Sequence, residues 1–221
     1  MAQQAMGLLV AGFDATNVQE DEFNDWYDLE HIPERRRVPG FLTIERWIGV
    51  ENPRVSIATY DLRSPDVLKS DAYRAIAGEN LSVWSKRVTA KAQRLCRFEA
   101  EQLPPGSQSA ASGASGLMMY AMNVAPEAEG EFNAWYDEEH IPRLSAVPGC
   151  LIARRFRIFN AASEGQQRYL AMYHLASPEV CSSAAWKEAA DTPWTGRMRP
   201  HFRDRLRVVL RRYQRGVNGK R

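Results

Sequence analysis

Apolar residues in the first half of the chain follow two different periods, and each period predicts one kind of element. Phe23, Trp26, Tyr27, Glu30 and His31 stand at i, i+3, i+4, i+7 and i+8, the spacing that places side chains on one face of a helix. Four shorter runs carry apolar residues on both faces, which is typical of strands covered on both sides. The predicted order is strand 6–13, a helix that begins near residue 21 and ends within 33–40, strand 41–50, strand 55–62, helix 64–77 and strand 91–101.

Local signals mark the ends of the two helices. Asp21 or a neighbour is a candidate N-cap of the first helix. Pro33 and then Val38-Pro39-Gly40 are expected to bring the helix to its end, because proline lacks an N–H and clashes inside a helix. The Val38-Pro39-Gly40 turn then leads into the second strand. Ser64 and Pro65 predict the start of the second helix, as N-cap and first helical residue.

The first helix occurs twice. Residues 22–33, EFNDWYDLEHIP, return 109 positions later as EFNAWYDEEHIP at residues 131–142, with ten of the twelve residues identical. The chain is therefore two copies of one unit. The second copy predicts strands at 117–123, 150–159, 168–175 and 202–213, with helices at 126–147 and from 177 onward.

The order β-α-β-β-α-β in each copy is that of a ferredoxin-like unit, whose antiparallel sheet carries both helices on one face. We predict an α+β fold with repeats at residues 1–102 and 117–221, joined by a Pro/Gly/Ser-rich linker at 103–116. A basic tail ends the second repeat. Because helices leave one face of each sheet uncovered, the two sheets are expected to pack together as an intramolecular pseudo-dimeric barrel.

Two such units with a Trp-Tyr-Asp-x-Glu-His-x-Pro helix resemble the dimeric α+β barrel superfamily, and within it the EthD-like branch. Most members of that superfamily have one unit per chain, so this chain resembles a tandem fusion. The resemblance covers nearly the whole sequence. It implies a small-molecule protein, in a group that includes lactone isomerases, polyketide cyclases and haem-degrading monooxygenases.

Bulk composition excludes several other classes. The formal charge of +2 gives no indication of nucleic acid or of a membrane surface, and we expect neither as a partner. No run approaches the 18–20 apolar residues, roughly, that a membrane span needs. Cys96, Cys150 and Cys181 have no CxxC spacing and predict reduced thiols. With no signal peptide visible at the start of the sequence, we expect a cytoplasmic protein.

His31 and His140 are the first candidates for chemistry, as acid/base groups at the end of the repeated helix. Asp28 and Asp137 precede them by three residues, a spacing that makes helix neighbours and predicts Asp–His pairs. Structural roles for both histidines remain open. The tyrosines of the two motifs are candidates for polarising a substrate carbonyl or for core packing: Tyr27 and Tyr136.

Arg46 and Arg155 occupy equivalent positions in the second strand of each repeat and are candidates to bind a substrate carboxylate. The alternative is that each arginine forms a structural ion pair with a glutamate of the helix. Such a glutamate lies on a mostly aromatic face, where a charged group needs a partner. Those glutamates are Glu30 and Glu139. Two tryptophans of the motif are candidates for substrate contact or, again, for packing: Trp26 and Trp135.

These residues predict a cofactor-independent isomerase, cyclase or lyase that moves protons on a carboxylate or phenolic small molecule. No HxH, HxxxH or Cys/His cluster predicts a metal site, and we expect neither metal nor cofactor. The alternatives are a ligand-binding protein without activity and a haem-dependent monooxygenase, for which one axial histidine such as His174 or His201 would suffice. We expect that two copies of this chain can also associate as a homodimer.

Overall fold

The structure is a computed structural model that describes residues 5–104, 106–160 and 166–215. The chain forms two compact units. The first comprises residues 1–109 together with the C-terminal segment from Tyr213, and the second comprises residues 110–212. The basic tail predicted for the second repeat therefore belongs with the first unit from Tyr213 onward, and its last residues, 216–221, lie outside the described part.

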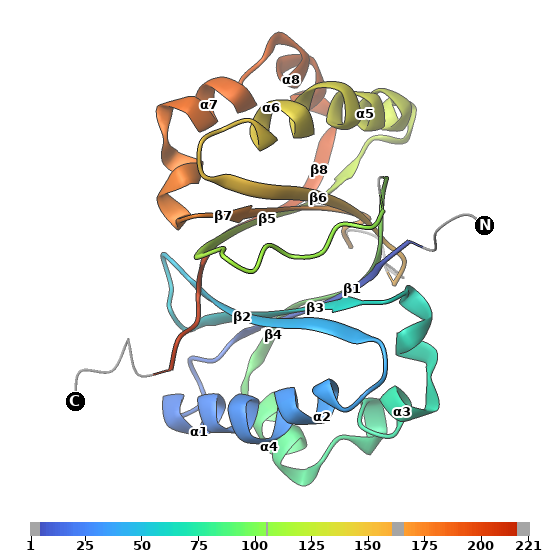
Figure 1. The fold of residues 1–221 in the computed structure, drawn as a ribbon, viewed down its shortest axis with the longest axis vertical. Coiled ribbons are helices and arrows are strands. Elements are labelled where there is room, and N and C mark those ends of the chain that lie inside the picture. Colours follow the sequence, from blue (N-terminus) through green and yellow to red (C-terminus); the bar gives the residue numbers. More distant parts are fainter. Residues whose placement is uncertain (1–4, 105, 161–165, 216–221) are drawn as a thin grey trace. The chain divides into compact units, whose positions relative to one another are not determined.

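The first unit has a four-stranded antiparallel sheet in the order β4-β1-β3-β2. Its helices lie on one face of that sheet (Figure 1). The strands and helical segments are β1 Gly7–Asp14, α1 Glu20–Asp25, η1 Trp26–His31, α2 Ile32–Arg36, β2 Phe41–Gly49, β3 Val55–Leu62, η2 Pro65–Lys69, α3 Asp71–Arg74, η3 Gly78–Asn80, α4 Val83–Lys91 and β4 Gln93–Gln102.

The second unit repeats this order, with a sheet β8-β5-β7-β6 and its helices again on one face (Figure 1). The predicted ferredoxin-like repeat is thus confirmed in both halves. Its elements are β5 Gly116–Val124, η4 Pro126–Ala128, α5 Glu129–Trp135, η5 Tyr136–His140, α6 Ile141–Ser145, β6 Cys150–Ile158, β7 Tyr169–Leu175, η6 Pro178–Ser182, α7 Ala184–Ala190, α8 Pro193–Met198, η7 Arg199–His201 and β8 Phe202–Arg212.

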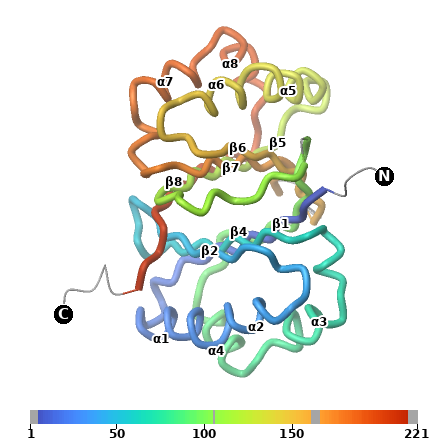
Figure 2. The backbone as a smooth tube through the Cα atoms, viewed as in Figure 1, coloured from blue at the N-terminus to red at the C-terminus, as the bar shows by residue number. Residues whose placement is uncertain are grey.

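The first helix passes Pro33 and ends at Arg36, before the Val38-Pro39-Gly40 turn, because a π-helical segment lets the helix continue. The backbone runs through α1, η1 and α2 without interruption (Figure 2). Pro33 lies in the first turn of α2, and the N–H of Ile32 bonds to the carbonyl of Tyr27, five residues earlier. The wider π turn directly before the proline relieves the crowding that a proline causes in a regular α-helix.

The second predicted helix is different from the expectation. Residues 64–77 form a short 3₁₀ segment, η2, and the single turn α3, separated by Ser70. Ser70 has extended backbone angles and its hydroxyl accepts a hydrogen bond from the N–H of Tyr73, so it caps α3 and interrupts the helix.

The turn into the second strand requires glycine in both units. Gly40 and Gly149 have φ angles of 100° and 90°, a conformation that residues with a side chain rarely adopt. Each follows the Val-Pro pair noted in the sequence. This turn brings β2 and β6 back under the helix that precedes them.

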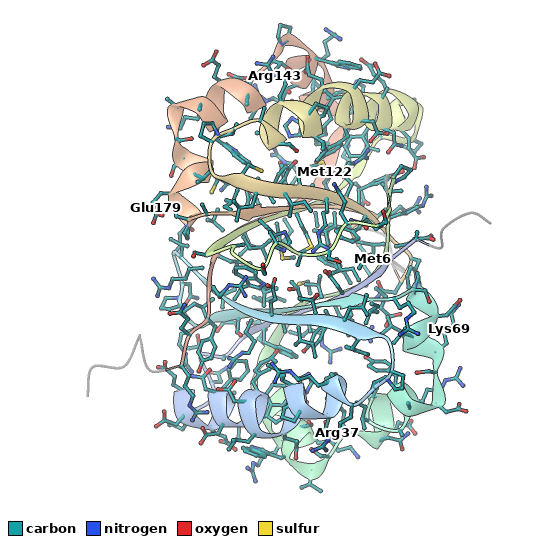
Figure 3. All side chains as sticks on the ribbon, in the orientation of Figure 1. Met6, Arg37, Lys69, Met122, Arg143 and Glu179 are labelled. Atoms are coloured by element: carbon teal, nitrogen blue, oxygen red, sulfur yellow. The ribbon has the colours of Figure 1, made fainter. Side chains whose placement is uncertain are left out.

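Side chains from the helices and the sheet fill the space between the two layers in each unit (Figure 3). Trp26 is fully buried there, and its Nε1–H donates to the hydroxyl of Ser85 on α4 at 2.9 Å. In the second unit, Trp135 donates in the same way to Thr195 on α8 at 3.2 Å. The two helical segments of each unit are therefore joined by one buried hydrogen bond as well as by packing.

Replacing Ser85 by alanine is expected to lower the free energy of unfolding by about 1–3 kcal/mol, because the buried indole N–H loses its acceptor. Ser85→Thr is the matched control, since the second unit uses threonine at this position. Denaturant unfolding measures both variants. Equal stability of Ser85→Ala and the wild type would contradict the assigned role of this bond.

Candidate functional site

The π segments gather aromatic rings around the two histidines of the motif. In the first unit the His31 ring lies 4.4 Å from Trp26 and 5.2 Å from Tyr27, between ring centroids. In the second unit the corresponding distances from His140 are 4.2 Å to Trp135 and 5.2 Å to Tyr136. Both histidines are almost covered, with exposed fractions of 9% and 8%.

Burial keeps both imidazoles neutral. Burial, together with a smaller effect of the nearby Arg155 guanidinium, lowers the pKa of His140 to about 3. The pKa of His31 also lies well below its ordinary value, because of burial and then of the charges on Arg35 and Arg46. In each ring Nδ1 is buried and has no hydrogen-bond partner. A neutral imidazole with an unused nitrogen can accept or donate one further hydrogen bond.

The predicted Asp–His pairs do not form. The carboxylate of Asp28 accepts from Nη1 of Arg46 at 3.1 Å, and that of Asp137 accepts from Nη1 of Arg155 at 2.6 Å. The spacing of three residues does place aspartate and histidine on adjacent turns. The aspartate points toward the strand arginine instead, because a charge-assisted bond to guanidinium is stronger than a bond to a neutral imidazole.

The alternative ion pairs between the strand arginines and the glutamates of the helix do not form, because the arginines pair with Asp28 and Asp137 instead. Glu30 accepts from the hydroxyls of Ser82 at 2.5 Å and of Ser85 at 3.2 Å, and Glu139 accepts from Thr192 at 2.5 Å. Glu30 thus binds the N-cap residue of α4, and Glu139 binds the N-cap residue of α8. The second terminal nitrogen of each arginine donates to an asparagine of the motif at 2.8 Å, Asn24 for Arg46 and Asn133 for Arg155.

Each strand arginine also lies over the tyrosine of its motif. The guanidinium carbon is 4.2 Å from the ring centroid of Tyr27 in the first unit and of Tyr136 in the second. Both terminal nitrogens of each guanidinium are occupied, so this arrangement favours positioning of the tyrosine over capture of a substrate carboxylate. Direct binding of substrate by Arg46 or Arg155 stays a prediction.

The tyrosine environments differ between the two units. Tyr136 and Tyr173, on β7, hydrogen-bond to each other through their hydroxyls. Their counterparts in the first unit, Tyr27 and Tyr60, are buried with hydroxyls that have no partner. Burial raises the pKa of Tyr27 to about 12 and that of Tyr60 well above its ordinary value, so both hydroxyls keep their protons.

A second difference lies on the helix that carries the histidine. Arg35, on α2, is 3% exposed and donates to the carbonyls of His31 at 3.2 Å and Ile76 at 3.3 Å, and to the carboxylate of Glu34 at 2.9 Å. Its charge acts on the pKa of Tyr27, His31 and Tyr60, in each case lowering it. The position 109 residues later is Leu144.

The first unit therefore combines three buried polar atoms without partners and a buried cation in one layer. We call this set the first-unit cluster: Tyr27, His31, Arg35 and Tyr60. Buried polar groups in proteins are nearly always paired, so such a set calls for a partner such as a water, an ion or a ligand, or for a catalytic role. Trp26 and Trp135, the predicted substrate contacts, are covered to 0% and 2% exposure and form the wall behind the histidines.

The residues that the repeat singles out do not fit a haem. An axial ligand needs an imidazole nitrogen facing open space, whereas His31 and His140 are each packed against a tryptophan and a tyrosine ring. His174 is fully buried in β7, and His201 is half-buried at the end of η7. Among the described residues, no three His, Cys, Asp or Glu side chains are grouped to hold a metal ion.

Sequence reasoning missed Tyr60 and Arg35. Alignment of the two copies puts Tyr60 opposite Tyr173, which is the signal that could have found the tyrosine pair. Arg35 is the first arginine of the Glu-Arg-Arg-Arg run at residues 34–37, and nothing in that run distinguishes the buried arginine from its solvated neighbours.

The fold is shared with solved structures of low sequence identity. An anthrone oxidase-like protein has a TM-score of 0.65 and 15% identity, over 97% of this chain and 95% of that one. A Fusobacterium nucleatum protein provisionally named a monooxygenase has a TM-score of 0.61 and 12% identity, over 97% and 94%. The chlorite dismutase of Candidatus Nitrospira defluvii, in complex with imidazole, has a TM-score of 0.60 and 9% identity, over 96% and 93%.

These structures have the dimeric α+β barrel fold, and this chain has the same fold, as the sequence predicted. A family model described as a domain of unknown function, DUF4286, matches residues 117–206. No curated sequence matches the chain. In the described part of the chain, every helix is too short or too polar to cross a membrane.

Proposed function

We propose that the first unit is a cofactor-independent enzyme site that moves a proton on a phenolic or enolisable small molecule. The observation that carries this proposal is the first-unit cluster, in which two phenol hydroxyls and an imidazole nitrogen are buried without partners. In this proposal Tyr27 and Tyr60 donate hydrogen bonds to a substrate oxygen, and His31 accepts the proton. The reaction class is that of isomerases, cyclases and lyases.

The electrostatics of the cluster support an anionic intermediate. Removing a proton from carbon or from a phenol leaves negative charge on oxygen, and fixed O–H donors in a water-poor site stabilise that charge strongly. Arg35 adds a positive charge nearby. His31 is a weak base in its buried position. When a proton moves from the substrate to His31, the substrate anion lies beside the imidazolium, and this attraction offsets the cost of burying the charge.

In this proposal the second unit has a structural role, and the chemistry takes place in the first unit. Its tyrosines satisfy each other, and Leu144 replaces the buried arginine. The stacked His140, Trp135 and Tyr136 then serve to hold the helix on the sheet. Asp28 and Asp137 act on their tyrosines through the strand arginines instead of orienting the histidines.

Oxygenation of the same kind of substrate is the second candidate. It is supported by the names of two similar structures, the anthrone oxidase-like protein and the provisionally named monooxygenase. Proton abstraction from a phenol or an enolisable carbon gives an electron-rich anion, so the first-unit cluster would supply the first step of this reaction too.

Proton exchange in D₂O tests the proposal. Purified protein is incubated with a panel of phenolic and enolisable ketones and lactones, and proton NMR follows loss of the acidic C–H signal, while an oxygen electrode follows oxygen uptake. We expect catalysed exchange with part of the panel. Tyr60→Phe is expected to slow it by at least tenfold, and the matched Tyr173→Phe variant is expected to retain it.

Two outcomes would sink the proposal. Saturable binding of panel compounds with no exchange and no oxygen uptake would identify a binding protein without activity. Equal loss of exchange in Tyr60→Phe and Tyr173→Phe would place the chemistry elsewhere than in the first-unit cluster.

A further inference from the structure

The chain segment after β8 packs on the helix–sheet layer of the first unit. The N–H of Tyr213 donates to the carbonyl of Arg46 at 2.9 Å, and the Tyr213 ring lies 3.9 Å from the guanidinium carbon of the same residue. Tyr27 lies 4.2 Å from that carbon. Two tyrosine rings, one near the end of the chain and one in the first-unit cluster, therefore contact one guanidinium.

Arg215 extends this contact to the helix. It donates to Oδ2 of Asp28 at 3.1 Å and is also paired with Asp25. Oδ1 of Asp28 accepts from Arg46. Asp28 thus bonds both the strand arginine, Arg46, and the tail arginine, Arg215. Tyr213 contacts Arg46 through its ring, so the tail contacts both members of the Asp28–Arg46 pair.

The second unit provides the matched case without a tail. Arg155 keeps its bonds to Asp137 and Asn133 and its contact with Tyr136. Of the described rings, only Phe132 and Tyr136 contact Arg155. The side chain of Asp137 is 60% exposed, whereas that of Asp28 is 24% exposed. The aspartate–arginine pair is the same in both units, and the added cover belongs to the first.

We propose that Tyr213 and Arg215 are positioning residues for the first-unit cluster: they hold Arg46 against Tyr27 and so fix the orientation of the Tyr27 phenol. This inference rests on the proposed function for its catalytic meaning, although the positioning itself does not require it. The unit that carries the unpaired hydroxyls and the buried arginine is also the unit that receives the tail.

The chemistry of the contact suits this role. A guanidinium is planar, so it can stack against an aromatic ring while its edge nitrogens remain bonded to a carboxylate and an amide. Loss of the Tyr213 ring leaves one face of Arg46 without its partner. Burial raises the pKa of Tyr27 to about 12 while the Arg46 charge opposes that rise, so a displaced Arg46 also changes the electrostatics at the phenol.

Fluorine NMR of the full chain tests the positioning directly. 3-Fluorotyrosine is placed at position 27 or, as the matched control, at position 136, in the wild type and in Tyr213→Leu, Tyr213→Phe and Arg215→Gln. We expect Tyr213→Leu to shift or broaden the resonance at 27 and to leave that at 136 unchanged. Tyr213→Phe keeps the ring and is expected to restore the wild-type signal. Arg215→Gln is expected to give a smaller shift, which added salt reproduces in the wild type.

The kinetic readout uses the exchange reaction. Tyr213→Leu is expected to lower kcat several-fold more than it raises KM, and Tyr213→Phe is expected to recover most of the rate. An unchanged resonance at 27 in Tyr213→Leu, or an equal change at 136, would overturn the inference. A shifted resonance in a protein that catalyses no exchange would keep the positioning and sink the proposed function, so the two failures are distinct.

Discussion

Replacing His31 by glutamine is expected to slow proton exchange by roughly 10²–10⁴-fold, the range typical of losing a positioned acid/base group. Glutamine retains hydrogen-bonding capacity and much of the imidazole volume, but it cannot accept a proton at neutral pH. The exchange rate in D₂O, measured as kcat at saturating substrate, gives the result. His140→Gln is the matched control and is expected to change the rate less than tenfold.

Stability separates this result from a structural one. Both histidines have the same packing, on a tryptophan and a tyrosine of their own unit, so the two variants are expected to lose similar free energies of unfolding. A rate loss confined to His31→Gln with matched stability losses supports the catalytic role. Equal rates in both variants would contradict it.

Acidification from pH 7.5 to pH 5 is expected to destabilise the second unit by about 2 kcal/mol through His140, at 1.36 kcal/mol for each pH unit between the unfolded pKa and pH 5. The first unit is expected to lose stability in the same direction through His31. The sign follows from the direction of the shifts. Both folded-state pKa values lie below the ordinary 6.5, and that of His140 is about 3. The unfolded chain therefore takes up protons at pH 5 while the folded chain does not. Denaturant unfolding at a series of pH values measures the loss.

The histidine variants are the controls for this pH dependence. His31→Gln and His140→Gln are each expected to remove about half of the slope between pH 7.5 and pH 5, and the double variant most of it. Carboxylates titrate mainly below this window, so they contribute little to it. A double variant with the full wild-type slope would show that other groups take up the protons.

Much of the fold could be predicted from the sequence because the repeat and the apolar periods agree. All eight strands lie where the pattern placed them, within two residues at their ends. The pattern gave no sign of the π turn before Pro33, because a period of 3.6 does not distinguish an α-helix from one that contains a π turn. It failed at Ser70 because a serine inside a helical pattern gives no sign that its hydroxyl caps a new turn.

The candidate site was predictable only in part, for a physical reason. Helix spacing placed Trp26, Tyr27 and His31 together, and the structure brings their rings into contact. Spacing along one helix does not determine which partner a charged side chain selects from another element. Asp28 therefore bonded a strand arginine, Glu30 bonded the serines of α4, and Tyr213 reached the site from the far end of the sequence.

Position 35 is arginine, whereas the equivalent position 144 is leucine, and this difference bears on how such a protein can evolve. A barrel made from two identical chains must accept every substitution twice, since one gene encodes both halves. A chain that carries both units is free of that constraint. One half can keep an arginine beside its histidine and unpaired tyrosine hydroxyls, while the other carries a leucine and paired hydroxyls at the equivalent positions. A chain that carries both halves can thus change one of them and leave the other to stabilise the fold.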